Sequence, residues 1–133
     1  MIIRTCLEGN ERAEVLSKLF GPLNAILLEA NVFAMAESLS DSYKGGMWLF
    51  YMLDDGGFYM APNTDAEFVV QSSNGSLETM SADAFGITVC LFVYSHLSFD
   101  DGKLAELCSE HYHCLREYMM DHAEVRSILT ATD

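Results

Sequence analysis

Apolar residues recur at helical spacing over the first third of the chain. The pattern predicts one helix from Asn10 to about Phe20, with Asn10 as its N-terminal cap. Gly21 ends that helix, and Pro22 suits the first turn of a second helix that continues to about Leu39. The second helix has a wide apolar face, so it is expected to pack against a core.

The apolar pattern changes to strand-like runs from Met47 onward. Aromatic and branched residues dominate the next segments, which is typical of β-strands. Turn signals at Asp54–Gly57 and Asn74-Gly75 separate the segments, because glycine supplies the backbone angles of tight turns. The sequence therefore predicts an antiparallel meander of three to four strands, at residues 47–53, 58–61, 67–72 and 76–80.

Helical spacing returns after the strands. Ser81 is expected to cap a helix whose residues 84–99 carry no charge, so this helix should be buried on nearly all sides. A turn at residues 100–102 precedes a fourth helix, and a short helix at 123–129 ends the chain. These elements predict an α+β fold, with a small antiparallel β-meander flanked by about five helices, in one domain spanning residues 1–133.

Acidic residues outnumber basic ones by 20 to 7, which gives the 133-residue chain a formal charge of −13. No Lys or Arg occurs between Lys44 and Lys103. Such a chain is repelled by phosphate backbones and anionic membranes, so no direct nucleic-acid binding and no membrane binding are expected. The acidic middle section could instead attract a basic protein surface, imitate DNA, or only keep the protein soluble.

The four cysteines show no CxxC spacing, and the N-terminal residues lack the apolar run of a signal peptide. No apolar stretch reaches the roughly 20 residues that a membrane-spanning helix needs. We therefore expect reduced cysteines and a cytoplasmic protein.

The best candidate for a metal site is the group Cys108, His111, His113 and Cys114. On one helix Cys108 and His111 are neighbours, whereas His113 points away from both, so the four cannot converge on one ion. Cys108 and His111 also fall on the apolar stripe of their helix. We expect a core-facing cysteine and a hydrogen-bonded core histidine, with no metal and no other cofactor.

A hydrolytic site could be built from Ser95-His96 with Asp83 or Asp100 as the acid. Adjacent helical residues point in different directions, however, so Ser95 and His96 cannot pair directly. No G-x-S-x-G motif is present either. The sequence thus favours a protein that is not an enzyme.

Two blocks at a fixed spacing, GGFYMAP at residues 56–62 and MSADA at residues 80–84, carry a family resemblance. The chain resembles the ArdB/KlcA antirestriction proteins, which are carried on plasmids and other mobile genetic elements. The resemblance covers nearly the whole chain from about Arg12. Further matching residues are Phe20-Gly21-Pro22, Tyr43, Gly45, Gly46, Trp48, Phe50, Tyr51, Gly86-Ile87, Ser95-His96-Leu97, Phe99, Tyr112, Leu115-Arg116, His122 and Asp133.

The resemblance implies relief of type I restriction-modification, so that incoming unmodified DNA survives. The partner would be the host type I restriction-modification enzyme, reached directly or indirectly. A DNA mimic would spread its acids along an elongated body, whereas this chain is half hydrophobic and has its acids at turns and helix ends. Binding through a defined patch is therefore favoured over DNA mimicry. The motif positions expected to contact a partner are Tyr43, Trp48, Asp83, His96 and Asp133.

Two other functions remain open on the sequence alone. One is a small hydrolase-type enzyme that uses His96 with a nearby acid. The other is an acidic protein-interaction domain that recruits a basic partner. An exposed strand edge could also pair two copies of the chain in a homodimer.

Overall fold

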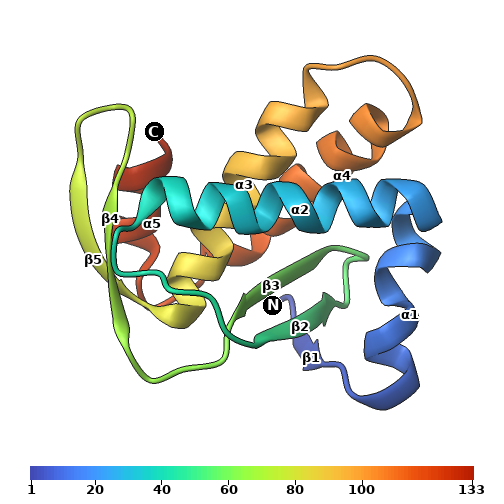
Figure 1. Cartoon of the computed structure of the whole chain (residues 1–133), viewed down its shortest axis with the longest axis horizontal. Coiled ribbons are helices and arrows are strands. Elements are labelled where there is room, and N and C mark those ends of the chain that lie inside the picture. The colour runs from blue at the N-terminus through green and yellow to red at the C-terminus, as the bar shows by residue number, and fades with distance from the viewer.

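The computed structural model describes residues 1–133 and contains five helices and five strands (Figure 1). The helices are α1 (Gly9–Phe20), α2 (Pro22–Leu39), α3 (Ala82–Ser98), α4 (Lys103–Met119) and α5 (Val125–Thr132). The strands are β1 (Arg4–Cys6), β2 (Trp48–Leu53), β3 (Phe58–Pro62), β4 (Glu67–Gln71) and β5 (Leu77–Ser81). Strand β1 precedes the first two helices, and the other four strands lie between α2 and α3 in the sequence. The predicted α+β class is confirmed.

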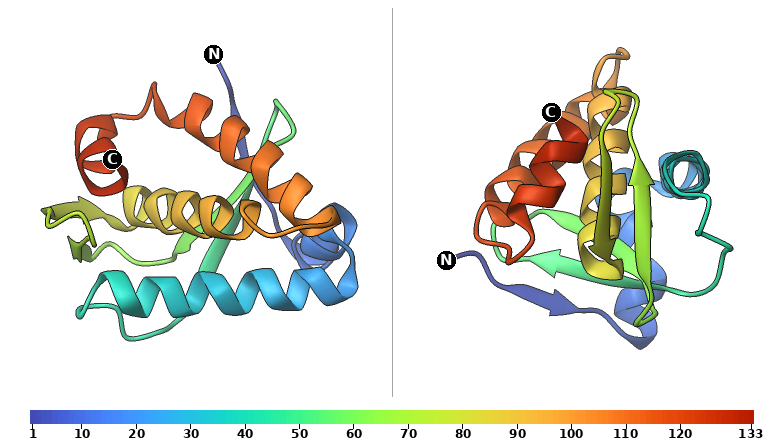
Figure 2. Two further views of the ribbon diagram at one scale, coloured as in Figure 1. Left: turned by 90° about the horizontal axis from the view of Figure 1, so that it is seen from above. Right: turned by 90° about the vertical axis from the view of Figure 1, so that its left-hand side faces the viewer.

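Helix α3 lies at the centre of the molecule, between α2 on one side and α4 on the other (Figure 2). It has no charged residue after Asp83, and eleven of its residues are buried. Burial on nearly all sides, as predicted from the apolar run, is confirmed. Side chains of α3 also bond to β3: the Tyr94 hydroxyl donates to the Phe58 carbonyl at 2.7 Å, and Cys90 donates to the Met60 carbonyl at 3.6 Å. These bonds satisfy carbonyls on the side of β3 that has no neighbouring strand.

The strands form two sheets rather than one continuous meander. One sheet has the order β1-β2-β3 and the other is the hairpin β4-β5, and every pairing is antiparallel. Strand β3 ends at Pro62, and residues 63–66 lead away from it before β4 begins. Proline has no N–H to continue a ladder, which favours a break at this point.

The N-terminal residues add a strand that the apolar pattern did not predict. Arg4 pairs with Leu53 and Cys6 pairs with Tyr51, so β1 lies along the edge of β2. This pairing carries the Arg4 side chain to the start of α3, where it contacts Asp83. The predicted cap at Asn10 is wrong, because α1 begins one residue earlier and Glu8 occupies the cap position.

The boundaries of α2 and α3 confirm the sequence prediction. Gly21 has φ +87°, a conformation that favours glycine, and Pro22 starts α2. Ser81 caps α3 by accepting a hydrogen bond from the Ala84 amide at 3.2 Å. No single helix is long and apolar enough to cross a membrane; α1 and α2 meet that standard only together, as a pair bent by 104°.

Candidate functional site

Asp83 is the centre of a polar network at the start of α3. It lies in the first turn of the helix, where its negative charge is favourable beside the positive end of the helix dipole. Its side chain is 28% exposed, so it is largely enclosed by its partners. Both carboxylate oxygens accept hydrogen bonds, from three different side chains.

Arg4 and Tyr59 share one oxygen of this carboxylate. Arg4 Nη1 lies 2.7 Å from Asp83 Oδ1, and the Tyr59 hydroxyl donates to the same oxygen at 2.9 Å. Arg4 Nη1 also lies 2.7 Å from the Tyr59 hydroxyl oxygen. The three groups thus form a closed triangle that connects β1, β3 and α3.

His122 occupies the second oxygen. Its Nε2 lies 2.8 Å from Asp83 Oδ2, while its Nδ1 accepts a hydrogen bond from the Glu124 backbone N–H at 2.9 Å. Because Nδ1 is an acceptor, Nε2 is the nitrogen that carries the proton and donates to Asp83. Both ring nitrogens are therefore engaged, and the turn between α4 and α5 is fixed to the start of α3.

Glu124 adds a second link between the same segments. Its carboxylate accepts hydrogen bonds from the backbone N–H of Ser81, at 2.9 Å, and from the Ser81 hydroxyl. The Ser81 hydroxyl oxygen at the same time caps α3. His122 and Glu124 thus bind the α4–α5 turn to two neighbouring positions at the start of α3.

Aromatic rings enclose the Arg4 side of the network. The Arg4 guanidinium lies over the Tyr51 ring, 4.4 Å from its centroid, which is cation–π geometry. Tyr51 stacks on Tyr59 with 4.9 Å between ring centroids, and Tyr118 lies 5.8 Å beyond Tyr59. Aromatic residues of β2 and β3 therefore support the guanidinium.

The surroundings of the network favour a charged Asp83 and a protonated Tyr59. Burial alone would raise the pKa of Asp83, but hydrogen bonds from His122 and Tyr59 and the charge of Arg4 outweigh it and lower that pKa. Burial and the nearby Asp83 charge raise the pKa of Tyr59, so its hydroxyl keeps the proton that it donates. Burial would lower the pKa of Arg4, yet the Tyr59 hydrogen bond and the neighbouring negative charge raise it above its ordinary value.

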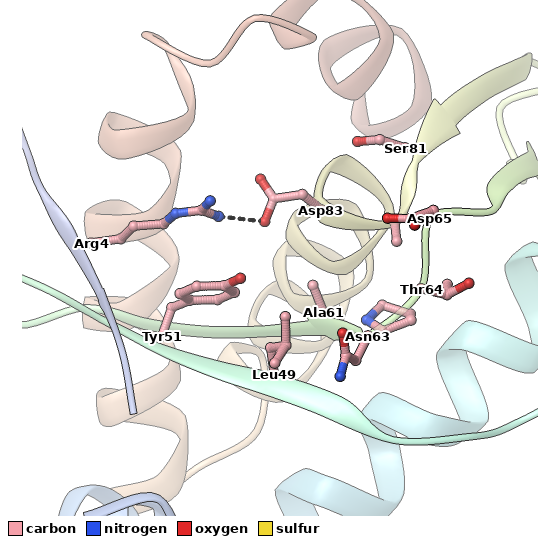
Figure 3. A pocket seen from close by; sticks show the side chains of 11 residues that line it. Arg4, Leu49, Tyr51, Ala61, Asn63, Thr64, Asp65, Ser81 and Asp83 are labelled. Carbon is pink, nitrogen blue, oxygen red and sulfur yellow. Dashed lines mark hydrogen bonds and ion pairs between the residues drawn. The ribbon is translucent and has the colours of Figure 1, made fainter. Parts of the chain in front are cut away.

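A cavity of about 330 Å³ opens beside this network (Figure 3). Arg4 and Tyr51 lie on one side of it, and Asn63, Thr64 and Asp65 lie on the other. Apolar side chains that include Leu49, Ala61 and Pro62 also line it. The arrangement can hold β1, β3, α3 and the α4–α5 turn in register, and it presents a mixed polar and apolar hollow to solvent.

Tyr43 and Trp48, two of the residues predicted to contact a partner, lie in the core. Their exposed fractions are 8% and 3%, and the Trp48 indole N–H donates to the Tyr43 hydroxyl oxygen at 3.0 Å. Phe33 packs edge-on against Trp48 at 5.6 Å between centroids. The pair is thus a hydrogen-bonded part of the core in this structure, and its role in partner binding stays a prediction.

The other predicted contact residues lie apart from one another. Asp83 is in the network at the start of α3, whereas His96 is exposed near the end of that helix, about 20 Å away at 1.5 Å per residue. The His96 ring lies 6.2 Å from the Phe92 ring and forms no hydrogen bond with an acid. Asp133 follows α5, with its carboxylate 3.5 Å from Arg116 Nη1.

The cysteine and histidine residues of α4 do not gather around a common point. Cys108 and His111 are buried, as predicted, whereas His113 is exposed, and no group of three metal-binding side chains occurs in the chain. The hydrogen bond expected for His111 is absent: its Nδ1 is buried without a partner. The ring instead packs between Phe20 and Tyr94, at 4.9 and 5.6 Å between centroids.

Sequence reasoning found Asp83 but did not group it with Arg4, Tyr59, His122 and Glu124. Tyr59 and His122 stand out in the sequence only as parts of the family resemblance, and Arg4 does not stand out at all. Arg4 and Asp83 are 79 positions apart, and the three-residue strand that carries Arg4 has no buried residue. No periodic signal marks such a strand.

Comparison with known proteins finds relatives that match nearly the whole chain. Residues 41–133 match the model of a family described as antirestriction protein. An antirestriction protein KlcA from Escherichia coli is 36% identical, over 99% of this chain and 94% of its own. The uncharacterized protein YafX from Escherichia coli K12 is 35% identical over 97% and 86% of the two chains. A solved structure from work on KlcA and ArdB superimposes with a TM-score of 0.91 at 33% identity, over 99% and 95% of the chains.

Proposed function

Because the chain belongs to the antirestriction protein family, we propose that it relieves type I restriction of incoming unmodified DNA by binding a protein, either one of the restriction system or one that acts on it. The observation that carries the proposal is the whole-chain structural similarity, with a TM-score of 0.91 over 99% of the chain. The work on KlcA and ArdB describes their activity as directed against type I DNA restriction systems. A similarity of that extent supports the same activity here.

The placement of the acids supports protein binding over DNA mimicry. Mimicry of DNA requires carboxylates that are free and spaced like phosphates. In this chain several acids already have basic partners: Asp83 lies against Arg4, Glu14 against Lys18, Glu106 against Lys103 and Asp133 against Arg116. These acids therefore contribute less to a continuous negative surface.

The geometry of the network supports binding over catalysis. A general base needs a lone pair that faces the substrate. His122 uses both ring nitrogens within the protein, and both Asp83 oxygens accept hydrogen bonds. His96, the base of the alternative hydrolase, has no acid to orient it. The network is better suited to holding a surface in a fixed shape.

The same work describes the activity of KlcA and ArdB as present in vivo but not in vitro. We take this to favour a route in which the chain acts through a component of the living cell. That component is either the assembled restriction enzyme in its cellular state or a protein that acts on it. A direct partner and an indirect one both fit this part of the proposal.

The test is the plating efficiency of unmodified phage on a host with a type I restriction system, with and without expression of the chain. We expect plating to rise on the restricting host and to stay unchanged on an isogenic host that lacks the system. Phage carrying the host modification serve as a second control and should plate equally in all strains. No rise on the restricting host, with the protein shown to be soluble and folded, would overturn the proposal.

A further inference from the structure

The cavity beside Asp83 holds hydrogen-bonding groups that the protein itself does not use. The Tyr51 hydroxyl and the Asp65 carboxylate line it and take part in no hydrogen bond or ion pair of the chain. Arg4 Nη1, by contrast, is committed to Asp83 and Tyr59. The Tyr51 hydroxyl oxygen and the Asp65 carboxylate are thus two open acceptors, on opposite sides of the cavity (Figure 3).

The charge of the cavity is negative. Arg4 is the sole basic residue among those that line it, and Asp83 neutralises it at 2.7 Å. Asp65 then remains as a carboxylate without a counter-ion. A protein with formal charge −13 adds a long-range attraction for cations. The Asp65 charge and the net charge of the protein would both disfavour an anionic ligand.

The size and lining of the cavity suit one long side chain. A volume of about 330 Å³ lies at the lower end of the range of roughly 300–1,000 Å³ that is typical of ligand pockets. Leu49 and Pro62 supply an apolar surface for a hydrocarbon stem, while the acceptors on Tyr51, Asn63 and Asp65 suit a polar head. Arginine fits this description best, because its planar guanidinium offers five N–H donors and sheds water more readily than an ammonium group.

We propose that this cavity receives an arginine side chain from the protein that the chain binds. The Asp65 carboxylate would accept the charge-assisted hydrogen bonds of the guanidinium, and the Tyr51 hydroxyl oxygen would accept another. The proposal rests on the proposed function for the identity of the partner, a protein of the restriction system or one that acts on it. The chemistry of the site does not rest on it, so the two can be tested separately.

The direct test is a titration of the ¹⁵N-labelled chain with the peptide acetyl-Gly-Arg-Gly-amide, followed by NMR. We expect shifts at the backbone amides of residues 63–65 and 82–83, and no comparable shifts with the peptide in which neutral citrulline replaces arginine. Asp65→Asn should weaken binding about tenfold, as expected for loss of a charge-assisted hydrogen bond. Equal binding of the two peptides would overturn the proposal.

Asp101→Asn is the matched control for Asp65→Asn. Both residues are exposed aspartates, and each change alters the formal charge by the same amount. Asp101 follows α3, whose 17 residues extend about 25 Å from the cavity at 1.5 Å per residue. If Asp101→Asn weakens peptide binding as much as Asp65→Asn does, the attraction is that of the net charge and the proposed site is wrong.

Plating assays with the charge-reversal variants Asp65→Arg and Asp101→Arg then link the cavity to restriction relief. We expect relief to be lost with Asp65→Arg and kept with Asp101→Arg, in proteins shown by urea unfolding to be folded. Relief that survives Asp65→Arg would reject the cavity as the partner site while the proposed function stands. If the wild-type chain gives no relief, the proposed function fails and the NMR titration alone decides whether the cavity binds arginine.

Discussion

Gly86 of α3 lies directly against Ala61 of β3. A Cβ atom placed on Gly86 would be 2.3 Å from the Ala61 Cβ, 2.4 Å from the Ala61 Cα and 2.5 Å from the Met60 carbonyl oxygen. Side chains never approach that closely, so α3 can pack on β3 at this distance only because residue 86 has no side chain. The contact fixes the height of the helix above the sheet, and with it the place of Asp83 one turn earlier.

Gly86→Ala should therefore destabilise the fold. In an unhindered helix the change would raise the free energy of unfolding by about 1 kcal/mol, because alanine is the better helix former. Here two of the three close contacts are backbone atoms, which cannot rotate away. We expect a net loss of about 2 kcal/mol from overpacking, measured by urea unfolding followed by circular dichroism.

The double variant Gly86→Ala with Ala61→Gly provides the control. Removing the Ala61 Cβ relieves the 2.3 Å contact but leaves the contacts to the Ala61 Cα and the Met60 carbonyl. The second change should therefore restore part of the lost stability and not all of it. If Gly86→Ala alone is as stable as the wild-type chain, α3 and β3 lie further apart than these distances indicate.

The sequence carries enough information to predict the helices and most strands, because their ends have local chemical causes. Pro22 starts α2, Ser81 caps α3 and Gly102 precedes α4. Each of these residues acts on backbone groups within a few positions. The division of the strands into two sheets was not predictable in the same way, since it depends on how the segment after Pro62 runs in space.

The candidate site was predictable only in part, because its members come from four separate segments. Asp83 stands out as an acid in the first turn of an apolar helix. Arg4 and His122 lie 79 and 39 positions away from it, and their pairing depends on the complete fold. Tyr43 and Trp48 illustrate the converse, since family motif residues can belong to the core and not to the surface.

Asp83→Asn should lower stability at neutral pH and change its dependence on pH. The amide keeps the shape of the side chain but removes the charge that faces Arg4, and its NH₂ group cannot accept a hydrogen bond from His122. We expect a loss of about 2 kcal/mol at pH 7, measured by urea unfolding. Asp101→Asn, an exposed site with the same change in charge, should stay within about 0.5 kcal/mol of wild type.

The sign of the pH effect follows from the lowered pKa of Asp83. The stabilisation by this carboxylate is fully present above its unfolded pKa of about 3.9, and it is lost as the pH falls through the lower folded value. The difference between the wild-type chain and Asp83→Asn should shrink as the pH falls below about 4. A difference that stays the same or grows below that pH would contradict the assignment.

Tyr43→Phe tests the hydrogen bond inside the aromatic core. In the wild-type chain the Trp48 indole nitrogen lies 3.0 Å from the Tyr43 hydroxyl oxygen. The variant keeps the ring but removes this acceptor. We expect a loss of about 1–2 kcal/mol in the free energy of unfolding, because the donor is buried. Relief of restriction should be measured on the same variant. Loss of relief in a folded protein would show that the Tyr43 hydroxyl also contacts the partner.

His111→Phe should make the protein less sensitive to mild acid. Burial lowers the pKa of His111 below its ordinary value, against the weaker opposing charges of Glu110 and Asp55. In the unfolded chain the imidazole binds a proton near pH 6.5, so between that pH and the folded pKa the unfolded state holds more protons. The wild-type chain should therefore lose stability as the pH falls below about 6.5, and the loss should stop once the folded pKa is passed.

Phenylalanine at this position removes the titrating group and fits the same contacts with Phe20 and Tyr94. It also removes the buried Nδ1 that has no partner, so stability at pH 8 should equal that of the wild-type chain or exceed it by up to about 1 kcal/mol. Urea unfolding at pH 8, 7, 6 and 5 measures both effects. His113→Phe, at an exposed position on the same helix, is the control and should keep the wild-type slope. Equal slopes for wild type and His111→Phe would mean that His111 protonates in the folded state as readily as in the unfolded one.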